Sequence, residues 1–199
     1  MIQHTIGLLL KPSAQWQSIS ELPEKSLNTL VLYPCIFAIL PAVAWFYGTT
    51  EIGWTVGQGE PVRLTAESAR QICILFYLAM VGSVAVIGYF IHWMSETYGA
   101  DSSIAKGIVI AGLTATPLFI TGMVGFYPLL WLDLLIGVAA ISWAVYLLYL
   151  GIPIVMGIPE ERGFLFSSAV LAIAMVILIC LMVGSVILWD FGAAPAFTD

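Results

Sequence analysis

Four ionisable side chains stand within or at the ends of long apolar runs, where their chemistry would matter most. Asp133 lies about one turn inside a run that begins near Leu129, and Lys106 lies near the start of the preceding run. His92 and Glu96 are four residues apart, so on a helix they share one face. Because an ionisable group in a membrane segment is costly, each of these residues is a candidate functional residue.

Asp133 permits two interpretations. A carboxylate near a helix end can be reached by water or can accept hydrogen bonds beside Tyr127, which would be a structural role. Alternatively, its charge lines a path for protons or cations. Lys106 can extend its ammonium group to the bilayer interface. Since Asp133 and Lys106 should lie near opposite membrane surfaces, we expect no salt bridge between them.

Neither metal nor enzyme chemistry is indicated. His92 and Glu96 could share a proton or hold part of a metal site, but two ligands on one helix need a third, and the alternative is a plain pair at a helix end. The sequence contains no CxxC pair, nucleophile elbow, phosphate loop or dinucleotide fingerprint. We therefore predict that the protein is not an enzyme and binds no metal or cofactor. The three cysteines all lie in apolar runs: Cys35, Cys73 and Cys180.

The composition is that of a membrane protein. Of the 199 residues 61% are hydrophobic and only 9% charged, and the mean hydropathy is +1.02. An ordinary soluble domain is about a quarter charged, so this chain could not cover a water-exposed surface. The net charge of −6 includes no basic run, and we expect no nucleic-acid partner. The expected partner is the lipid bilayer.

Five apolar runs approach or exceed the roughly 20 residues that cross a bilayer. Pro34 and Pro41 predict a bend in the first run, and the short link Tyr127-Pro128 predicts an antiparallel hairpin between the third and fourth. The predicted fold is an all-α integral membrane protein with five transmembrane helices, at residues 30–47, 72–94, 104–126, 129–150 and 164–189.

The connecting segments predict smaller elements. Residues 1–27 are predicted to form an amphipathic segment, in which Ser13 caps a short helix that lies on the cytoplasmic membrane surface. In the loop at 48–70, apolar and polar residues alternate on both sides of Gly57-Gln58-Gly59, which predicts a β-hairpin between the first two spans. Thr65 is the expected N-cap of the second span. Residues 191–199 form a short tail.

Basic residues predict the orientation. Five spans place the termini on opposite sides, and cytoplasmic loops carry an excess of Lys and Arg. The N-terminal side has four basic residues and the other side has two, Arg63 and Arg70. We therefore expect a multi-pass protein with a cytoplasmic N-terminus and an outer C-terminus.

Small residues predict how the helices pack. In lipid, helices associate through small side chains that allow close approach. Gly107, Ala111 and Ala115 recur every four residues and share one face of the third span. This face could serve contacts within one bundle or contacts with a second copy, so a homo-oligomer is one possible assembly.

The same segment carries a resemblance to a known family. Residues 111–123, AGLTATPLFITGM, resemble the Gly-aromatic…Pro segment of the Yip (Ypt/Rab-interacting protein) domain family, with Gly112 and Pro117 matching and Leu113 standing where an aromatic residue is frequent. Residues 146–164, YLLYLGIPIVMGIPEERGF, resemble the family's junction between helices 4 and 5. GTTEIGW and YPLLWL look like segments of bacterial inner-membrane members. The resemblance makes residues 28–190 a five-helix Yip-type membrane domain.

The resemblance implies a bacterial inner-membrane protein whose C-terminus is periplasmic. Eukaryotic members are linked to Rab-type GTPases, but this chain reads NTLVLYP where those members carry an acidic Asp-Leu-Tyr-Gly-Pro motif, so no GTPase partner is expected. The family supplies no catalytic residues. Two functions stay open: a non-enzymatic membrane scaffold that organises lipids or an unknown protein partner, and a small channel or transporter lined by Asp133.

Overall fold

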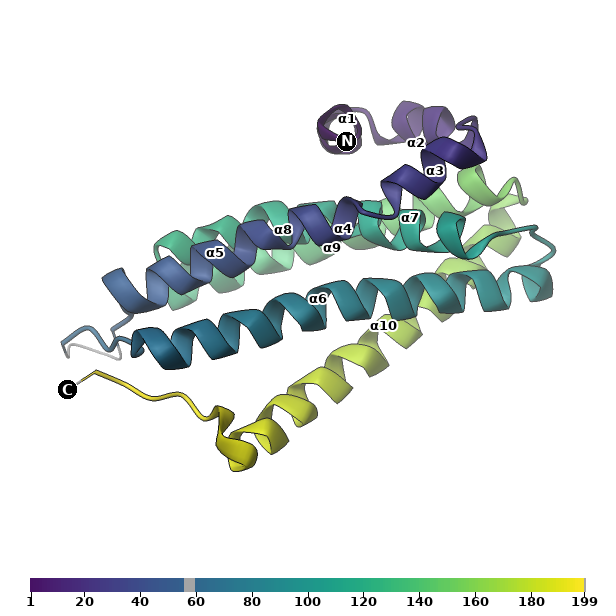
Figure 1. Cartoon of the computed structure of the whole chain (residues 1–199). Coiled ribbons are helices and arrows are strands. Elements are labelled where there is room, and N and C mark those ends of the chain that lie inside the picture. The colour runs from purple at the N-terminus through teal and green to yellow at the C-terminus, as the bar shows by residue number, and fades with distance from the viewer. Residues whose placement is uncertain (56–59, 199) are drawn as a thin grey trace.

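The computed structural model describes residues 1–55 and 60–198 and is built from helices (Figure 1). Its first part consists of short helices: α1 (Ile2–Leu10), α2 (Pro12–Ser20), α3 (Glu24–Leu30), α4 (Tyr33–Phe37), α5 (Ile39–Tyr47) and η1 (Gly48–Ile52). The rest of the chain forms three long helices with shorter ones between and after them: α6 (Ala66–Ser95), η2 (Glu96–Tyr98), α7 (Ile104–Thr114), α8 (Thr116–Thr121), η3 (Gly122–Phe126), α9 (Leu130–Met156), α10 (Glu160–Leu188) and η4 (Trp189–Ala193).

In the described part of the chain, four helical segments are long and apolar enough to cross a membrane: Glu24–Ile52, Ala66–Tyr98, Leu130–Met156 and Glu160–Ala193. Ile104–Thr114 and Thr116–Phe126 are bent by 44° and make a fifth span if they cross as one. The all-α membrane fold is therefore confirmed, with four spans or five. The predicted positions are close to those observed, although most of the helices extend beyond the apolar runs.

Prolines interrupt the first span and the bent one. Pro34 lies in the first turn of α4, and Pro117 in the first turn of α8. Proline cannot donate a backbone hydrogen bond, and its ring clashes with the preceding turn. The axis therefore changes at Ala115, between α7 and α8.

The N-caps of two long helices follow the sequence. Thr65 Oγ1 accepts a hydrogen bond from the backbone N of Ser68 (3.4 Å), as predicted for the start of α6. Ser103 Oγ accepts from the backbone N of Lys106 (3.2 Å) at the start of α7. Ser13, in contrast, is not a cap, because α2 begins one residue earlier with Pro12 at its first position.

The predicted β-hairpin is wrong for the described residues, which contain no strand. Gly48–Ile52 continue the preceding helix as a π-helical turn, in which the Thr49 and Thr50 hydroxyls donate to backbone carbonyls. A single antiparallel bridge joins Trp54 and Val62, and residues 56–59 lie outside the described residues. The helical turn takes Ile52, the first residue of the predicted alternation.

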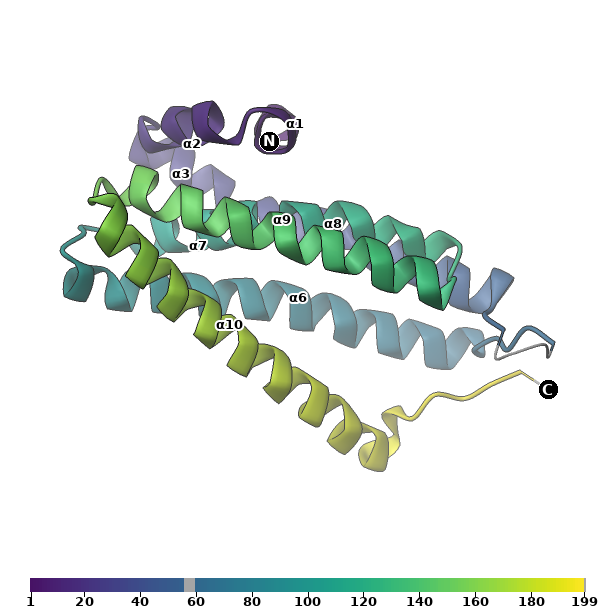
Figure 2. The same ribbon diagram turned by 180° about the vertical axis from the view of Figure 1, so that it is seen from behind.

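The helices form one bundle, in which α5, α6, α7, α8 and α9 run side by side (Figures 1 and 2). α10 meets the others near the start of its own length and then diverges from α6, as both views show. α1 is seen end-on in both views, so it crosses the bundle at a steep angle. The C-terminus lies at the end where α5 turns into α6, and α3 lies at the other end.

Candidate functional site

The close contact between α6 and α7 depends on two glycines. A Cβ on Gly88 would lie 2.6 Å from Ile108 Cα, and a Cβ on Gly107 would clash with the Gly88 carbonyl oxygen. The two backbones therefore touch, as small residues in membrane helices allow. Gly107 and Ala111 are both buried here, whereas Ala115 is half-buried.

Gly112 faces another element. A Cβ on it would lie 3.2 Å from Pro34 Cδ, so the absence of a side chain at Gly112 lets the proline ring of the first span pack closely against α7. Pro117 is buried at the start of α8. Two contacts escaped the sequence analysis: Gly122 against Pro41, and Gly125 against Trp45. Their nearest sequence signal is the Gly-x-x-Gly spacing of 122 and 125, which alone does not say what faces them.

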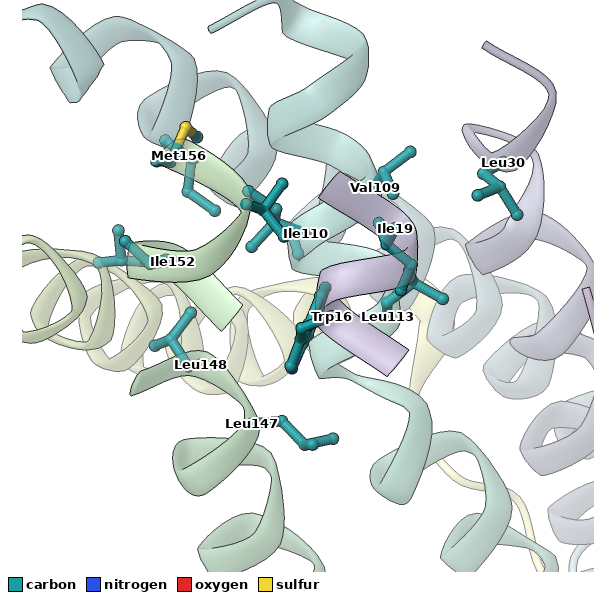
Figure 3. Close-up of a cluster of buried hydrophobic side chains, with 14 of the residues drawn as sticks. Trp16, Ile19, Leu30, Val109, Ile110, Leu113, Leu147, Leu148, Ile152 and Met156 are labelled. Atoms are coloured by element: carbon teal, nitrogen blue, oxygen red, sulfur yellow. The ribbon is translucent and has the colours of Figure 1, made fainter. Parts of the chain in front are cut away.

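The N-terminal segment is docked on the bundle rather than separate from it. Trp16 and Ile19 of α2 are buried against α7 and α9, as Figure 3 shows for Leu113 and Leu147. The Trp16 indole lies over Gly151, where a Cβ would be 2.6 Å from its Cε2 atom. The apolar side chains of α2 thus pack on protein, whereas Ile2, Ile6 and Leu10 of α1 stay exposed.

Polar bonds also fix α1. Thr5 Oγ1 bonds to the Tyr33 hydroxyl (3.0 Å), which in turn bonds to Thr116 Oγ1 (2.8 Å), so three elements share one buried chain of hydroxyls. Gln15 Nε2 lies 2.7 Å from Nδ1 of His4. Burial, together with the positive N-terminus, holds the pKa of His4 below its usual value.

Asp133 lies in the first turn of α9, where the positive end of the helix dipole favours a carboxylate. Its Oδ1 atom is buried and has no hydrogen-bond partner among the described residues. The expected hydrogen bond near Tyr127 does not occur in this part of the chain, and Tyr127 is mostly exposed. Asp133 thus carries an unsatisfied acceptor that could take a proton, a water molecule or a cation.

Lys106 lies in the first turn of α7, at the opposite end of the bundle from the start of α9 (Figure 1). Its Nζ donates to the backbone oxygen of Asp101 (3.4 Å). Lys106 and Asp133 are therefore far apart. The Lys106 ammonium group binds the loop before α7 and forms no site with the Asp133 carboxylate.

His92 and Glu96 are not brought into one site. His92 lies in the last turn of α6, with its Nδ1 buried and unpartnered among the described residues, whereas Glu96 is exposed at the start of η2. The described residues contain no group of three His, Cys, Asp or Glu side chains that could hold a metal ion. As placed, the pair lacks the third ligand that a metal would need.

A helical bundle with several segments that are long and apolar enough to cross a membrane defines a class, the multi-pass membrane proteins. Residues 6–182 match the Yip1 domain model, and the chain belongs to that family. It is 39% identical to "Inner membrane protein YohC" of Escherichia coli K12 over 191 residues, which cover 96% of this chain and 98% of that protein. The YohC protein of E. coli O6:H1 matches equally well. No solved structure matches the chain. The family resemblance seen in the sequence is thus confirmed.

Proposed function

We propose that this protein is a non-enzymatic scaffold of the bacterial inner membrane, which gathers lipids or a protein partner around its helices. The observation that carries the proposal is the exposure of α10. Gly163, Phe166, Ser167 and Val170 are buried, but no residue of the helix beyond Val170 is. More than two turns of apolar helix therefore offer their whole circumference to the surroundings.

The divergence of α10 is anchored at both ends. Near its start, the rings of Phe166 and Tyr98 stack with centroids 4.7 Å apart. Beyond its end, the backbone N of Ala196 donates to Ser68 Oγ (3.0 Å), and Thr65 N donates to Ala196 O (2.9 Å). Because the tail binds the start of α6, contacts at both ends of α10 hold it in its position diverging from α6. Such a surface favours lipid or a partner helix as its cover.

Photocrosslinking tests the scaffold proposal. A photoreactive amino acid at Val183, which is 55% exposed, should form adducts with lipids or with a second protein in native membranes. The same group at the fully buried Phe166 should react only within its own chain. Crosslinks from Val183 to α6 of the same molecule would show that α10 closes on the bundle, and the proposal would lose its support.

The unpartnered Oδ1 of Asp133 favours a second candidate, a small channel or transporter. A carboxylate without a partner in hydrocarbon costs about 2.5 kcal/mol or more on insertion scales, so water or a cation beside it would explain its presence. Liposomes with a pH-sensitive dye should separate the two functions. A scaffold leaks protons no faster than empty liposomes, whereas a pathway conducts in the wild type and stops in Asp133→Asn.

The proposed location rests on the relatives, whose printed name is an inner membrane protein. We propose that the N-terminus is cytoplasmic and the C-terminus periplasmic, because four of six basic residues lie on the N-terminal side. A second copy is one candidate for the partner that covers α10. We place such a contact on α10 rather than on the face of Gly107 and Ala111, because both of these residues are buried within the chain.

A further inference from the structure

A groove of about 340 Å³ runs between α5 and α6 on the outside of the bundle. Each helix contributes a stripe of one face, spaced by three, four and seven residues: Ile39, Val43 and Phe46 from α5, and Arg70, Ile74 and Tyr77 from α6. α5 and α6 run antiparallel (Figure 1), so the last residue of the α5 stripe, Phe46, and the first of the α6 stripe, Arg70, belong to the same end of the groove. Seven residues of helix span about 10.5 Å, which accommodates part of one acyl chain.

The two ends of the groove differ in chemistry. At the deep end, the Tyr77 hydroxyl donates to the backbone oxygen of Cys35 (3.0 Å), which satisfies its polar group and ties α6 to the first span. At the other end stands Arg70, exposed and one turn after the start of α6. An Arg at this depth lies at the boundary between hydrocarbon and headgroups.

Arg70 also borders a second hollow of about 320 Å³, which it shares with Glu67 and Gln71. Glu67 and Arg70 are one turn apart on the same helix face, and both are exposed. A cation, an anion and a neutral amide thus stand side by side at the mouth of an apolar groove. This pattern matches a headgroup that carries both charges.

We propose that this groove binds phosphatidylethanolamine, a deduction that rests on the proposed function as a lipid-organising scaffold. Arg70 binds the phosphate through its guanidinium group, which suits phosphate oxygens geometrically. Glu67 accepts hydrogen bonds from the primary ammonium group, and one acyl chain lies along Val43 and Ile74. A headgroup with a net negative charge would meet the Glu67 carboxylate without a compensating cation, so the site disfavours phosphatidylglycerol.

Native mass spectrometry of the purified full-length protein tests the site, with phosphatidylethanolamine and phosphatidylglycerol of identical acyl chains added separately. The wild type should retain phosphatidylethanolamine preferentially. Arg70→Gln should lower retention of both lipids about tenfold, because a charged hydrogen bond to phosphate is lost. Glu67→Gln should remove the preference and leave phosphatidylglycerol bound at least as well. Arg63→Gln is the control, since Arg63 does not line the groove and donates to the backbone oxygen of Ile52 at the end of η1 (3.4 Å).

A variant that fills the groove keeps the test independent of the charges. Val43→Trp places a large side chain on the exposed wall, 52% accessible in the wild type, and should lower retention without altering the buried core. Equal retention of the two lipids by the wild type, or unchanged retention in both Arg70→Gln and Val43→Trp, would overturn the proposal. Adducts at Val183 would still report on the scaffold in that case, because α10 does not line the groove.

Discussion

Single glycines decide how closely the helices of this domain approach. Gly88 and Gly82 lie on the same helix, α6, but a Cβ on Gly88 would press on Ile108, whereas a Cβ on Gly82 has no heavy atom within 4 Å. The pair therefore separates packing from helix propensity.

Gly88→Ala should lower the free energy of unfolding by about 1–3 kcal/mol, because the backbones of α6 and α7 must separate. Gly82→Ala should be neutral or stabilising by up to about 1 kcal/mol, since alanine favours helix. Thermal unfolding in detergent measures both. Equal shifts in the two variants would mean that α6 and α7 are not in backbone contact.

His4 should make the docking of α1 depend on pH. Its pKa in the folded protein lies below the usual value of about 6.5, first because it is buried and second because the N-terminus is positive. The unfolded segment therefore binds the proton more tightly. The docked state of α1 therefore has its full stability above about pH 6.5, where His4 is neutral in both states. It loses stability as the pH falls toward the pKa of His4 in the folded protein.

Hydrogen exchange of the amides in α1 should accordingly rise between pH 7.5 and 5.5, after correction for the intrinsic exchange rate. In His4→Gln the corrected rates should not change over this range, because no titrating group remains at this position. A wild type with constant corrected rates would contradict the assignment to His4.

At the scale of elements, Trp16 is the largest side chain that α2 buries against the bundle. Trp16 is fully buried against Gly151, whereas Trp93 on α6 is 64% exposed. Trp16→Ala should release α2 at a cost of about 3–5 kcal/mol. Trypsin should then cleave faster after Lys25, and Trp93→Ala should leave the cleavage rate unchanged. An unaltered rate in Trp16→Ala would show that other contacts hold the segment.

For the whole molecule, the distribution of basic residues predicts the topology. A reporter fused at the C-terminus should be active only in the periplasm, and one fused to the N-terminus only in the cytoplasm. If the bent pair α7–α8 entered and left the membrane on one side, the chain would have four crossings and both termini would share a compartment. C-terminal fusions active only in the cytoplasm would support that arrangement over ours.

The sequence by itself determined the class of the protein and the approximate position of its helices. A membrane span must satisfy its own backbone hydrogen bonds within one apolar segment, so its signal is local. The breaks in the first span, where Pro34 and Pro41 predicted a bend, are equally local, because each proline acts on its own turn. The bend before Pro117 was not predicted. The hairpin prediction failed since alternation over a few residues competes with the tendency of a helix to continue.

Only the tertiary structure decided which faces meet. Lipid tails are as apolar as leucine, so hydrophobicity does not mark the side of a span that packs on protein. The sequence marked Gly107 as a small residue on a packing face, but it did not indicate that Gly107 packs against Gly88. The divergence of α10, the tail bound to Ser68 and the groove at Arg70 each join residues far apart in the chain, and such contacts exist only once the helices have packed.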